Sequence, residues 1–383
     1  MNYNFDEIIN RTHSDSVKWN YYKKEALPLW VADMDFKSPQ PVVDALLERV
    51  QHGVFGYPLP DPVLKEVICA RLKNLYAWEV IPEEIEFLPG VVNGFNAVIH
   101  ALTEPGDGVL MQTPVYPPFL GAPQNARAFR QENQLARGKD QYQVDFTDFE
   151  NQIKKNTSLF LFCNPHNPVG RVFNKQELET LADICLRHDV AICSDEIHCD
   201  LIFKGYQHLP IASLDAEVAA KTITLMAPSK TFNIAGLECS FAVVQSAEMK
   251  KRLETAYQGL VSHVNIMGYT AALAAYEHGQ EWLDQLLVYL EQNRDYLVDF
   301  VQSNLPGVKM TVPEGTYLAW LDFNQLNLEP SPFEFLMNEG KVALNDGKTF
   351  GKGGDGFVRL NFGCPRKTLM DGLKRLQEAV YPS

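Results

Sequence analysis

Apolar residues recur at helical spacing in several stretches of the chain. After Ser38-Pro39 the pattern continues to Gly53, which predicts a capped amphipathic helix that ends near that glycine. Asp61-Pro62 opens a second helix, and Asn174 with Glu177 resembles a capping box at the start of a third. The same spacing runs through two stretches nearer the C-terminus, residues 281–304 and 367–380.

Short runs that are apolar on both faces lie between the predicted helices, as in strands of a buried parallel sheet. They are residues 108–111, 159–163, 190–193 and 222–226. Their alternation with helices over roughly residues 85–245 indicates α/β architecture. In the last ~100 residues, two helical stretches flank the strand-like runs 316–321 and 356–362, which indicates a smaller α+β unit.

Composition narrows the classes of partner. The chain has 383 residues, 46% hydrophobic, with a formal net charge of −14. This acidic balance argues against nucleic acid or an anionic membrane as partner, because phosphates require Lys and Arg. No apolar run approaches the ~20 residues of a membrane helix, and the first residues do not resemble a secretory leader. The seven cysteines form no C-x-x-C pair, which suits reduced thiols in a cytoplasmic protein.

Polar side chains follow three of the predicted strands. Asn167 lies after strand 159–163, Asp195 comes just after the run 190–193, and Lys230 follows strand 222–226. Because ligands of α/β sheets bind beyond the carboxyl ends of the strands, we expect an amide, a carboxylate and a lysine to converge on one rim.

Each of these features has a functional and an ordinary interpretation. Lys230, if partly buried, is a neutral amine that can form an imine with an aldehyde, or else a solvated loop lysine. Asp195 can pair with a protonated pyridine nitrogen or cap the next segment. Asn167 can donate to a phenolic oxygen or form an Asx-turn. The helix start within residues 88–97 can bind phosphate or be a plain strand–helix turn.

Three other patterns are excluded by their context. Residues 351–356 match G-x-G-x-x-G but precede a strand, so the pattern of a nicotinamide dehydrogenase fails. Residues 347–349 read Gly-Lys-Thr, yet Val342 stands where a phosphate-binding loop needs its first glycine. The acidic, His and Cys residues of 195–200 have no spacing typical of a metal site, so no metal is predicted.

Taken together, the motifs resemble fold-type I pyridoxal-phosphate enzymes of the aminotransferase superfamily, and within them the MalY/PatB-type cystathionine β-lyases (C–S lyases). The superfamily resemblance rests on residues 164–170, Asp195 with His198, and Ser229-Lys230. The narrower resemblance rests on residues 5–6, 15–19, 29–36, 195–198, 229–233 and 359–363. These motifs extend over nearly the whole chain.

The resemblance implies an aspartate aminotransferase-like fold, with a large α/β domain built on a mostly parallel sheet and a smaller α+β domain. Residues 1–45 would form an N-terminal arm and part of the small domain. Residues 46–280 would form the large domain that binds pyridoxal 5′-phosphate, and residues 281–383 the C-terminal small domain.

The resemblance also implies roles for residues around the cofactor ring. Lys230 would bind the cofactor covalently and later move the substrate's Cα proton. Asp195 would pair with the pyridinium nitrogen, and Asn167 would donate to the 3′ oxygen and help hold the substrate carboxylate. His198 stands where many relatives have a tyrosine that contacts this oxygen. Tyr116, predicted as catalytic with Lys230, would stack on the ring.

Further roles concern the phosphate and the substrate. Val91 and Val92 would present backbone N–H groups to the phosphate, and Tyr57 would reach the phosphate of a neighbouring subunit, which implies a homodimer with composite sites. Arg359 would bind the substrate α-carboxylate bidentately. One departure is Glu238, which replaces an arginine that many relatives place on the phosphate. We expect Glu238 to point away, and the set of phosphate ligands is incomplete.

The implied reaction is α,β-elimination of L-cystathionine or related cysteine S-conjugates to a thiol, pyruvate and ammonia. Two alternatives stay open at this point. The first is an aminotransferase of the same fold, because both reactions start from the same carbanion. The second is a family member with an added regulatory binding role.

Overall fold

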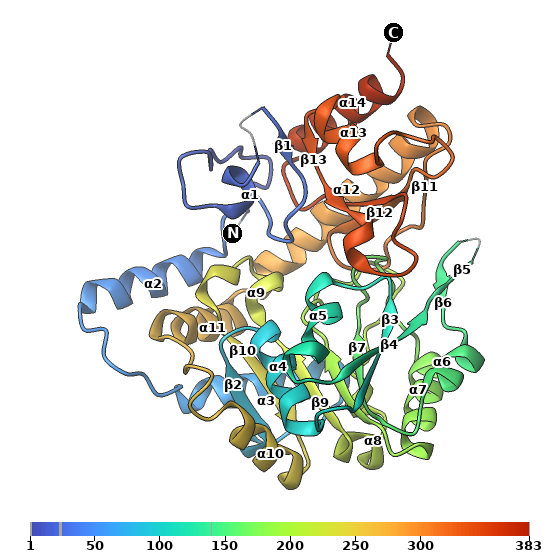
Figure 1. The fold of residues 1–383 in the computed structure, drawn as a ribbon. Coiled ribbons are helices and arrows are strands. Elements are labelled where there is room, and N and C mark those ends of the chain that lie inside the picture. The colour runs from blue at the N-terminus through green and yellow to red at the C-terminus, as the bar shows by residue number, and fades with distance from the viewer. Residues whose placement is uncertain (1, 23–24, 139, 383) are drawn as a thin grey trace.

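A seven-stranded sheet forms the centre of the protein in a computed structural model, which describes residues 2–22, 25–138 and 140–382 (Figure 1). The strand order is β2-β10-β9-β8-β7-β3-β4. The run from β9 to β4 is parallel, whereas β10 is antiparallel to both β9 and β2. The strands are β2 (Ile85–Leu88), β3 (Gly108–Thr113), β4 (Phe129–Gln134), β7 (Thr157–Cys163), β8 (Ala191–Asp195), β9 (Thr222–Met226) and β10 (Ser240–Val244).

Helices cover both faces of this sheet because its strands are apolar on both faces. In β7, Leu159 and Leu161 pack in one hydrophobic cluster with α4 and α10, while Phe160 and Phe162 pack in another with α7. The helices that accompany the large sheet are α2 (Gln40–His52), α3 (Pro62–Tyr76), α4 (Val91–Leu102), α5 (Pro117–Asn125), α6 (Phe146–Gln152), α7 (Lys175–Arg187), α8 (Ala216–Ala220), α9 (Pro228–Thr231), α10 (Ala247–Tyr257) and α11 (Ile266–His278).

The C-terminal part contains a four-stranded antiparallel sheet, ordered β11-β12-β15-β14. Its strands are β11 (Lys309–Met310), β12 (Leu318–Asp322), β14 (Asn345–Asp346) and β15 (Phe357–Asn361). Its helices are α12 (Gln280–Asn304), α13 (Pro332–Asn338) and α14 (Arg366–Val380). The N-terminal segment, with α1 (Val17–Asn20), lies beside this part, because β1 (Leu27–Pro28) pairs in parallel with β13 (Val342–Ala343) (Figure 1). The short pair β5 (Ala136–Arg137) and β6 (Tyr142–Gln143) completes the strands of the described residues.

The predicted fold class is confirmed, including the mostly parallel sheet. The capping box of α7 forms as expected, since Asn174 Oδ1 accepts from the N–H of Glu177 and the Glu177 carboxylate accepts from the N–H of Asn174. The exact domain boundaries, at 45/46 and 280/281, stay a prediction. Residues 351–356 lie directly before β15. The glycine pattern therefore precedes a strand, as predicted when a dinucleotide-binding site was excluded.

Two features of the described residues bear on membranes and metals. No helix there is long and apolar enough to cross a lipid bilayer. Within the same residues, no group of three or more His, Cys, Asp or Glu side chains is arranged to hold a metal ion. All seven cysteines are free, and every one except Cys69 is buried.

Candidate active site

A cavity of about 460 Å³ lies where the carboxyl ends of β7, β8 and β9 meet the N-terminal segment and β15. Eight of the nine predicted site residues line it, and Tyr57 does not. The eight are Val91, Val92, Tyr116, Asn167, Asp195, His198, Lys230 and Arg359. They come from positions 91 to 359 of the chain, so only the folded structure brings them together.

Lys230 lies in α9, the short helix that follows β9. Its Nζ donates to the carbonyl oxygen of Ala32 at 2.6 Å. Burial lowers the pKa of Lys230 to about 8, against the opposing effects of the Asp33 and Asp195 carboxylates. An appreciable fraction of this amine is therefore uncharged near neutral pH, as a nucleophile or proton acceptor requires.

Asp195 ends β8 and is buried, with one side-chain hydrogen bond, from the Ile197 N–H to Oδ1 at 3.1 Å. Burial raises the pKa of Asp195 to about 7, and the neighbouring Glu196 acts in the same direction. No ion pair joins Asp195 to any cation among the described residues. A buried carboxylate in this situation fits a cationic ligand atom, such as a protonated pyridine nitrogen.

The raised pKa of Asp195 predicts a pH effect on the cofactor-free protein. Between about pH 4 and pH 7 the folded state holds a proton that the unfolded chain has lost, so this group lowers stability as the pH rises through that range. In the cofactor-free protein we expect Asp195→Asn to raise the thermal midpoint relative to wild type at pH 8. That advantage should shrink towards pH 4 in paired thermal melts.

The matched control for this prediction is Asp183→Asn, which removes an exposed carboxylate at the surface of α7. Its difference from wild type should lack the rise between pH 4 and pH 8. A pH-independent difference for Asp195→Asn would contradict the burial argument.

His198 has a buried imidazole whose Nδ1 has no hydrogen-bond partner among the described residues. Its ring meets that of Tyr317 edge-on at 5.8 Å between centroids. Burial lowers the pKa of His198 to about 3, with further lowering from Lys230 and Arg359. The imidazole is therefore neutral at neutral pH, and the unpaired nitrogen is free for a ligand atom in the cavity.

Arg359 is a buried cation in the middle of β15. Its guanidinium donates to Asn167 Oδ1 at 2.9 Å, to Asn345 Oδ1 at 2.5 Å and to the Trp30 carbonyl oxygen at 3.0 Å. Burial lowers the pKa of Arg359 to about 10, so it stays charged at neutral pH. Its hydrogen bonds within the described residues go to neutral oxygens, which suits the binding of an anion.

Asn167 and Tyr116 are joined through the backbone, because the Tyr116 N–H donates to the Asn167 carbonyl oxygen at 3.1 Å. Tyr116 is the N-cap residue of α5, and burial raises the pKa of its phenol. Asn167 is buried, and its Oδ1 is occupied by Arg359 while its Nδ2 makes no hydrogen bond to a described group. An amide donor and an aromatic ring therefore line the same wall of the cavity.

The N-terminus of α4 forms another wall. Gly90, the N-cap, has φ of 94° and offers no side-chain cap, and the N–H groups of Val91 and Val92 make no hydrogen bond to described residues. Such free N–H groups at a twelve-residue helix suit a phosphate. That Glu238 points away from this end stays a prediction. Glu238 is exposed, lines the same cavity and has a left-handed backbone conformation, with φ of 49°.

Tyr57 is fully exposed, in an extended stretch between α2 and α3 that also exposes Val54, Phe55 and Leu59. Within its own chain it contributes nothing to the cavity. Its predicted role at the phosphate of a neighbouring subunit stays a prediction.

Sequence reasoning missed three contributors to the site. Ala32 offers its carbonyl oxygen to both Lys230 and Tyr317, whose hydroxyl donates to it at 2.9 Å. Asn345 accepts from Arg359. A backbone acceptor has no side-chain signal. Asn345 and Tyr317 lie in segments whose approach to the cavity depends on how the C-terminal sheet packs.

The fold and the cavity define a class of protein: an α/β enzyme with a lysine, a buried carboxylate and a helix N-terminus arranged for pyridoxal phosphate. Residues 24–376 match the family model for aminotransferase class I and II. The chain belongs to this family, and the family resemblance seen in the sequence is confirmed.

Three individual relatives are similar to this chain over nearly its whole length. The chain is 41% identical to cystathionine β-lyase PatB of Bacillus subtilis, covering 98% of this chain and 100% of PatB. A PLP-bound C–S lyase structure from Staphylococcus hominis has 33% identity and a TM-score of 0.94, covering 100% of both chains. A PLP-bound structure from Clostridium difficile, provisionally named an aminotransferase, has 40% identity and a TM-score of 0.96 over 99% of this chain and 100% of that one.

Proposed function

We propose that the chain is a pyridoxal-phosphate-dependent C–S β-lyase that cleaves L-cystathionine and related cysteine S-conjugates. The observation that carries the proposal is the meeting of Lys230, Asp195 and Arg359 in one cavity. The relatives support the lyase assignment, because those from Bacillus subtilis and Corynebacterium glutamicum are named cystathionine β-lyases and cover at least 98% of this chain. A cytoplasmic location stays a prediction from the sequence.

The cavity residues fit the cofactor. When bound, pyridoxal phosphate supplies an aldehyde for covalent attachment and a ring that delocalises negative charge from Cα. Asp195 would hold a proton on the ring nitrogen, and the N–H groups of Val91 and Val92 would bind the phosphate. Asn167 Nδ2 and the unpaired nitrogen of His198 would face the phenolic oxygen, and Tyr116 would pack against the ring.

The protein's own residues then act on the substrate. Arg359 binds the α-carboxylate and fixes the orientation of Cα. Lys230 takes the Cα proton at Nζ, since its pKa of about 8 leaves part of the amine neutral. The Cβ–S bond then breaks and the thiolate leaves. Overall, cystathionine and water give homocysteine, pyruvate and ammonia.

Pyruvate release from L-cystathionine without any 2-oxo acid tests this proposal directly. A lyase produces one pyruvate per homocysteine, whereas an aminotransferase stalls after one turnover without an acceptor. L-Alanine is the matched control substrate, because it has no leaving group on Cβ and should give no pyruvate under the same conditions. Turnover only in the presence of a 2-oxo acid would favour transamination instead.

We also propose that the enzyme is a homodimer in which Tyr57 reaches the phosphate of the neighbouring site. Tyr57→Phe should weaken cofactor binding by about 10-fold, the effect of losing one hydrogen bond to a charged group. The measurement is equilibrium titration of cofactor-free protein with pyridoxal phosphate. Tyr206→Phe, an exposed tyrosine elsewhere on the surface, is the control. Equal affinity for all three proteins would contradict the composite site.

A further inference from the structure

The backbone of residues 30–36 contacts two of the principal cavity residues. The Ala32 carbonyl oxygen accepts from Lys230 Nζ at 2.6 Å, and the Trp30 carbonyl oxygen accepts from Arg359 at 3.0 Å. Small displacements of this segment would therefore move the partners of both groups. The segment belongs to the 29–36 motif, for which the proposed mechanism gives no role.

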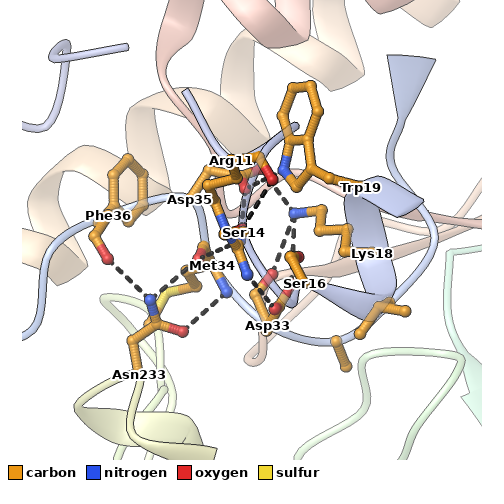
Figure 2. Close-up of polar contacts among 12 residues, drawn as sticks. Arg11, Ser14, Ser16, Lys18, Trp19, Asp33, Met34, Asp35, Phe36 and Asn233 are labelled. Atoms are coloured by element: carbon orange, nitrogen blue, oxygen red, sulfur yellow. Dashed lines mark hydrogen bonds and ion pairs between the residues drawn. The ribbon is translucent and has the colours of Figure 1, made fainter. Parts of the chain in front are cut away.

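A cluster of charged side chains also holds this segment, and we name it the Asp33–Asp35 cluster (Figure 2). Asp35 accepts from Lys18 Nζ at 2.6 Å, from Arg11 at 2.7 Å and from Trp19 Nε1 at 2.8 Å. Asp33 accepts from Arg11 at 2.8 Å, and its carbonyl oxygen accepts from Lys18 Nζ at 3.1 Å. Arg11 and Lys18 thus each bridge both carboxylates or their backbone.

Burying the charged side chains of this cluster costs free energy. The Lys18 side chain is 0% exposed and that of Asp35 is 4% exposed, whereas Arg11 and Asp33 are 22% and 24% exposed. Burial alone would raise the pKa of Asp35, but Lys18, Trp19 and Arg11 together hold it below its usual value. Apolar residues of similar volume would fix a segment at least as well. The burial of these charges is therefore weak evidence that the cluster serves stability alone.

The loop after Lys230 holds the segment as well. Asn233 Nδ2 donates to the carbonyl oxygens of Met34 and Phe36, at 2.9 and 2.8 Å, and its Oδ1 accepts from the Met34 N–H at 2.9 Å (Figure 2). Asn233 follows Lys230 by three residues. The lysine's own loop is therefore attached to the backbone that carries the Asp33–Asp35 cluster.

Asp33 is the member of the cluster nearest in sequence to the Lys230 contact, directly after Ala32. Its Oδ1 is buried, has no hydrogen-bond partner among the described residues, and lies 3.7 Å from Lys18 Nζ. Its charge favours the protonated form of Lys230, in opposition to burial. Arg11 lies 2.8 Å from the Asp33 carboxylate and Lys18 Nζ lies 3.7 Å from it, so the two cations offset part of that charge.

We propose that Asp33 is a positioning residue for Lys230, and that Arg11 and Lys18 set how much of its negative charge the amine faces. The proposal deepens the proposed lyase function and rests on it. The N-terminal motif thereby gains a role, because it holds the Ala32 carbonyl oxygen against Lys230 and adjusts the proton affinity of that amine.

Other charged or titratable groups also face Lys230, and the test must separate them from Asp33. Asp195 and His198 come from the end of β8, Arg359 comes from β15, and the hydroxyl of Tyr317 shares the Ala32 carbonyl oxygen. Tyr116 and Glu238 line the same cavity. None of these groups is changed in the variants below.

The test uses paired substitutions that break the same contact but change the local charge in opposite directions. Asp33→Asn removes an anion and should lower the pH midpoint of Lys230, while Arg11→Gln removes a cation and should raise it, each by roughly 0.5–1 pH unit. The double variant should return towards wild type. Both residues are partly exposed, and circular dichroism checks that each variant folds.

The readout is the reactivity of Lys230 towards trace acetic anhydride as a function of pH, in cofactor-free protein, followed by mass spectrometry of its peptide. Lys37→Gln is the control, since its exposed ion pair with Glu7 adjoins the same segment. Opposite shifts support the proposal. Unchanged midpoints, or shifts in the same direction, would overturn it and leave the cluster a merely structural anchor. Because labelling requires no turnover, this outcome is independent of whether cystathionine is a substrate.

Discussion

Replacement of Lys230 by alanine is expected to abolish pyruvate release and the visible absorbance of lysine-bound cofactor. The amine has two proposed roles, covalent attachment and proton transfer at Cα, and nothing else in the described cavity can replace it. The positioned proton transfer alone contributes up to about 10⁴-fold, so we expect kcat to fall at least that far. The measurement is pyruvate release from L-cystathionine, together with an absorbance spectrum of the purified protein.

A suitable control for this experiment is Lys175→Ala, at the exposed start of α7. It should retain both the spectrum and the turnover of wild type. Substantial pyruvate formation by the Lys230 variant would refute the assigned role of the amine. Loss of absorbance with retained folding, measured by circular dichroism, separates a chemical effect from unfolding.

The second large effect is expected at Arg359. Arg359→Leu removes two charge-assisted hydrogen bonds to the substrate carboxylate, each worth about 1.5–3 kcal/mol, so kcat/KM should fall between about 10²- and 10⁴-fold. Arg359→Lys retains the charge but not the planar donor pair. Its kcat/KM should therefore lie between the values of wild type and of Arg359→Leu. Steady-state kinetics with L-cystathionine measure both.

The cofactor content of the Arg359 variants distinguishes a role of Arg359 in substrate binding from a general disturbance of the site. The Arg359 variants should still bind pyridoxal phosphate, because the arginine has no proposed contact with the cofactor. Arg187→Leu, which removes an exposed arginine paired with Glu150, should behave as wild type. Wild-type kcat/KM in Arg359→Leu would show that another group binds the carboxylate.

Much of the fold followed from local patterns in the sequence. The apolar runs that became β7, β8 and β9 specify a buried sheet, and the polar residues at their ends specified where the cavity would lie. Helix signals were also read correctly at Asp61, whose side chain accepts from the N–H of Val63, and at Gly53, which ends α2 with φ of 76°.

The contributions that were missed depend on contacts between distant segments. Ser38 has the sequence signature of a helix cap, yet its hydroxyl donates to the Asn233 carbonyl oxygen and Pro39 occupies the N-cap position of α2. The Ala32 carbonyl oxygen serves Lys230 from 198 residues away. Local propensity carries no information on such pairs, since tertiary packing alone decides them.

The N-terminal segment has a consequence for redesign of substrate range. Asn361 of β15 donates to the carbonyl oxygens of Val31 and Asp33, while Asn233 beside Lys230 binds the same segment at Met34 and Phe36. The arginine proposed to recognise the amino acid and the lysine proposed to move its proton thus share a single stretch of main chain. Directed evolution that reshapes the Arg359 end for bulkier thioethers is therefore expected to alter the pH optimum as well, and libraries should diversify both ends together.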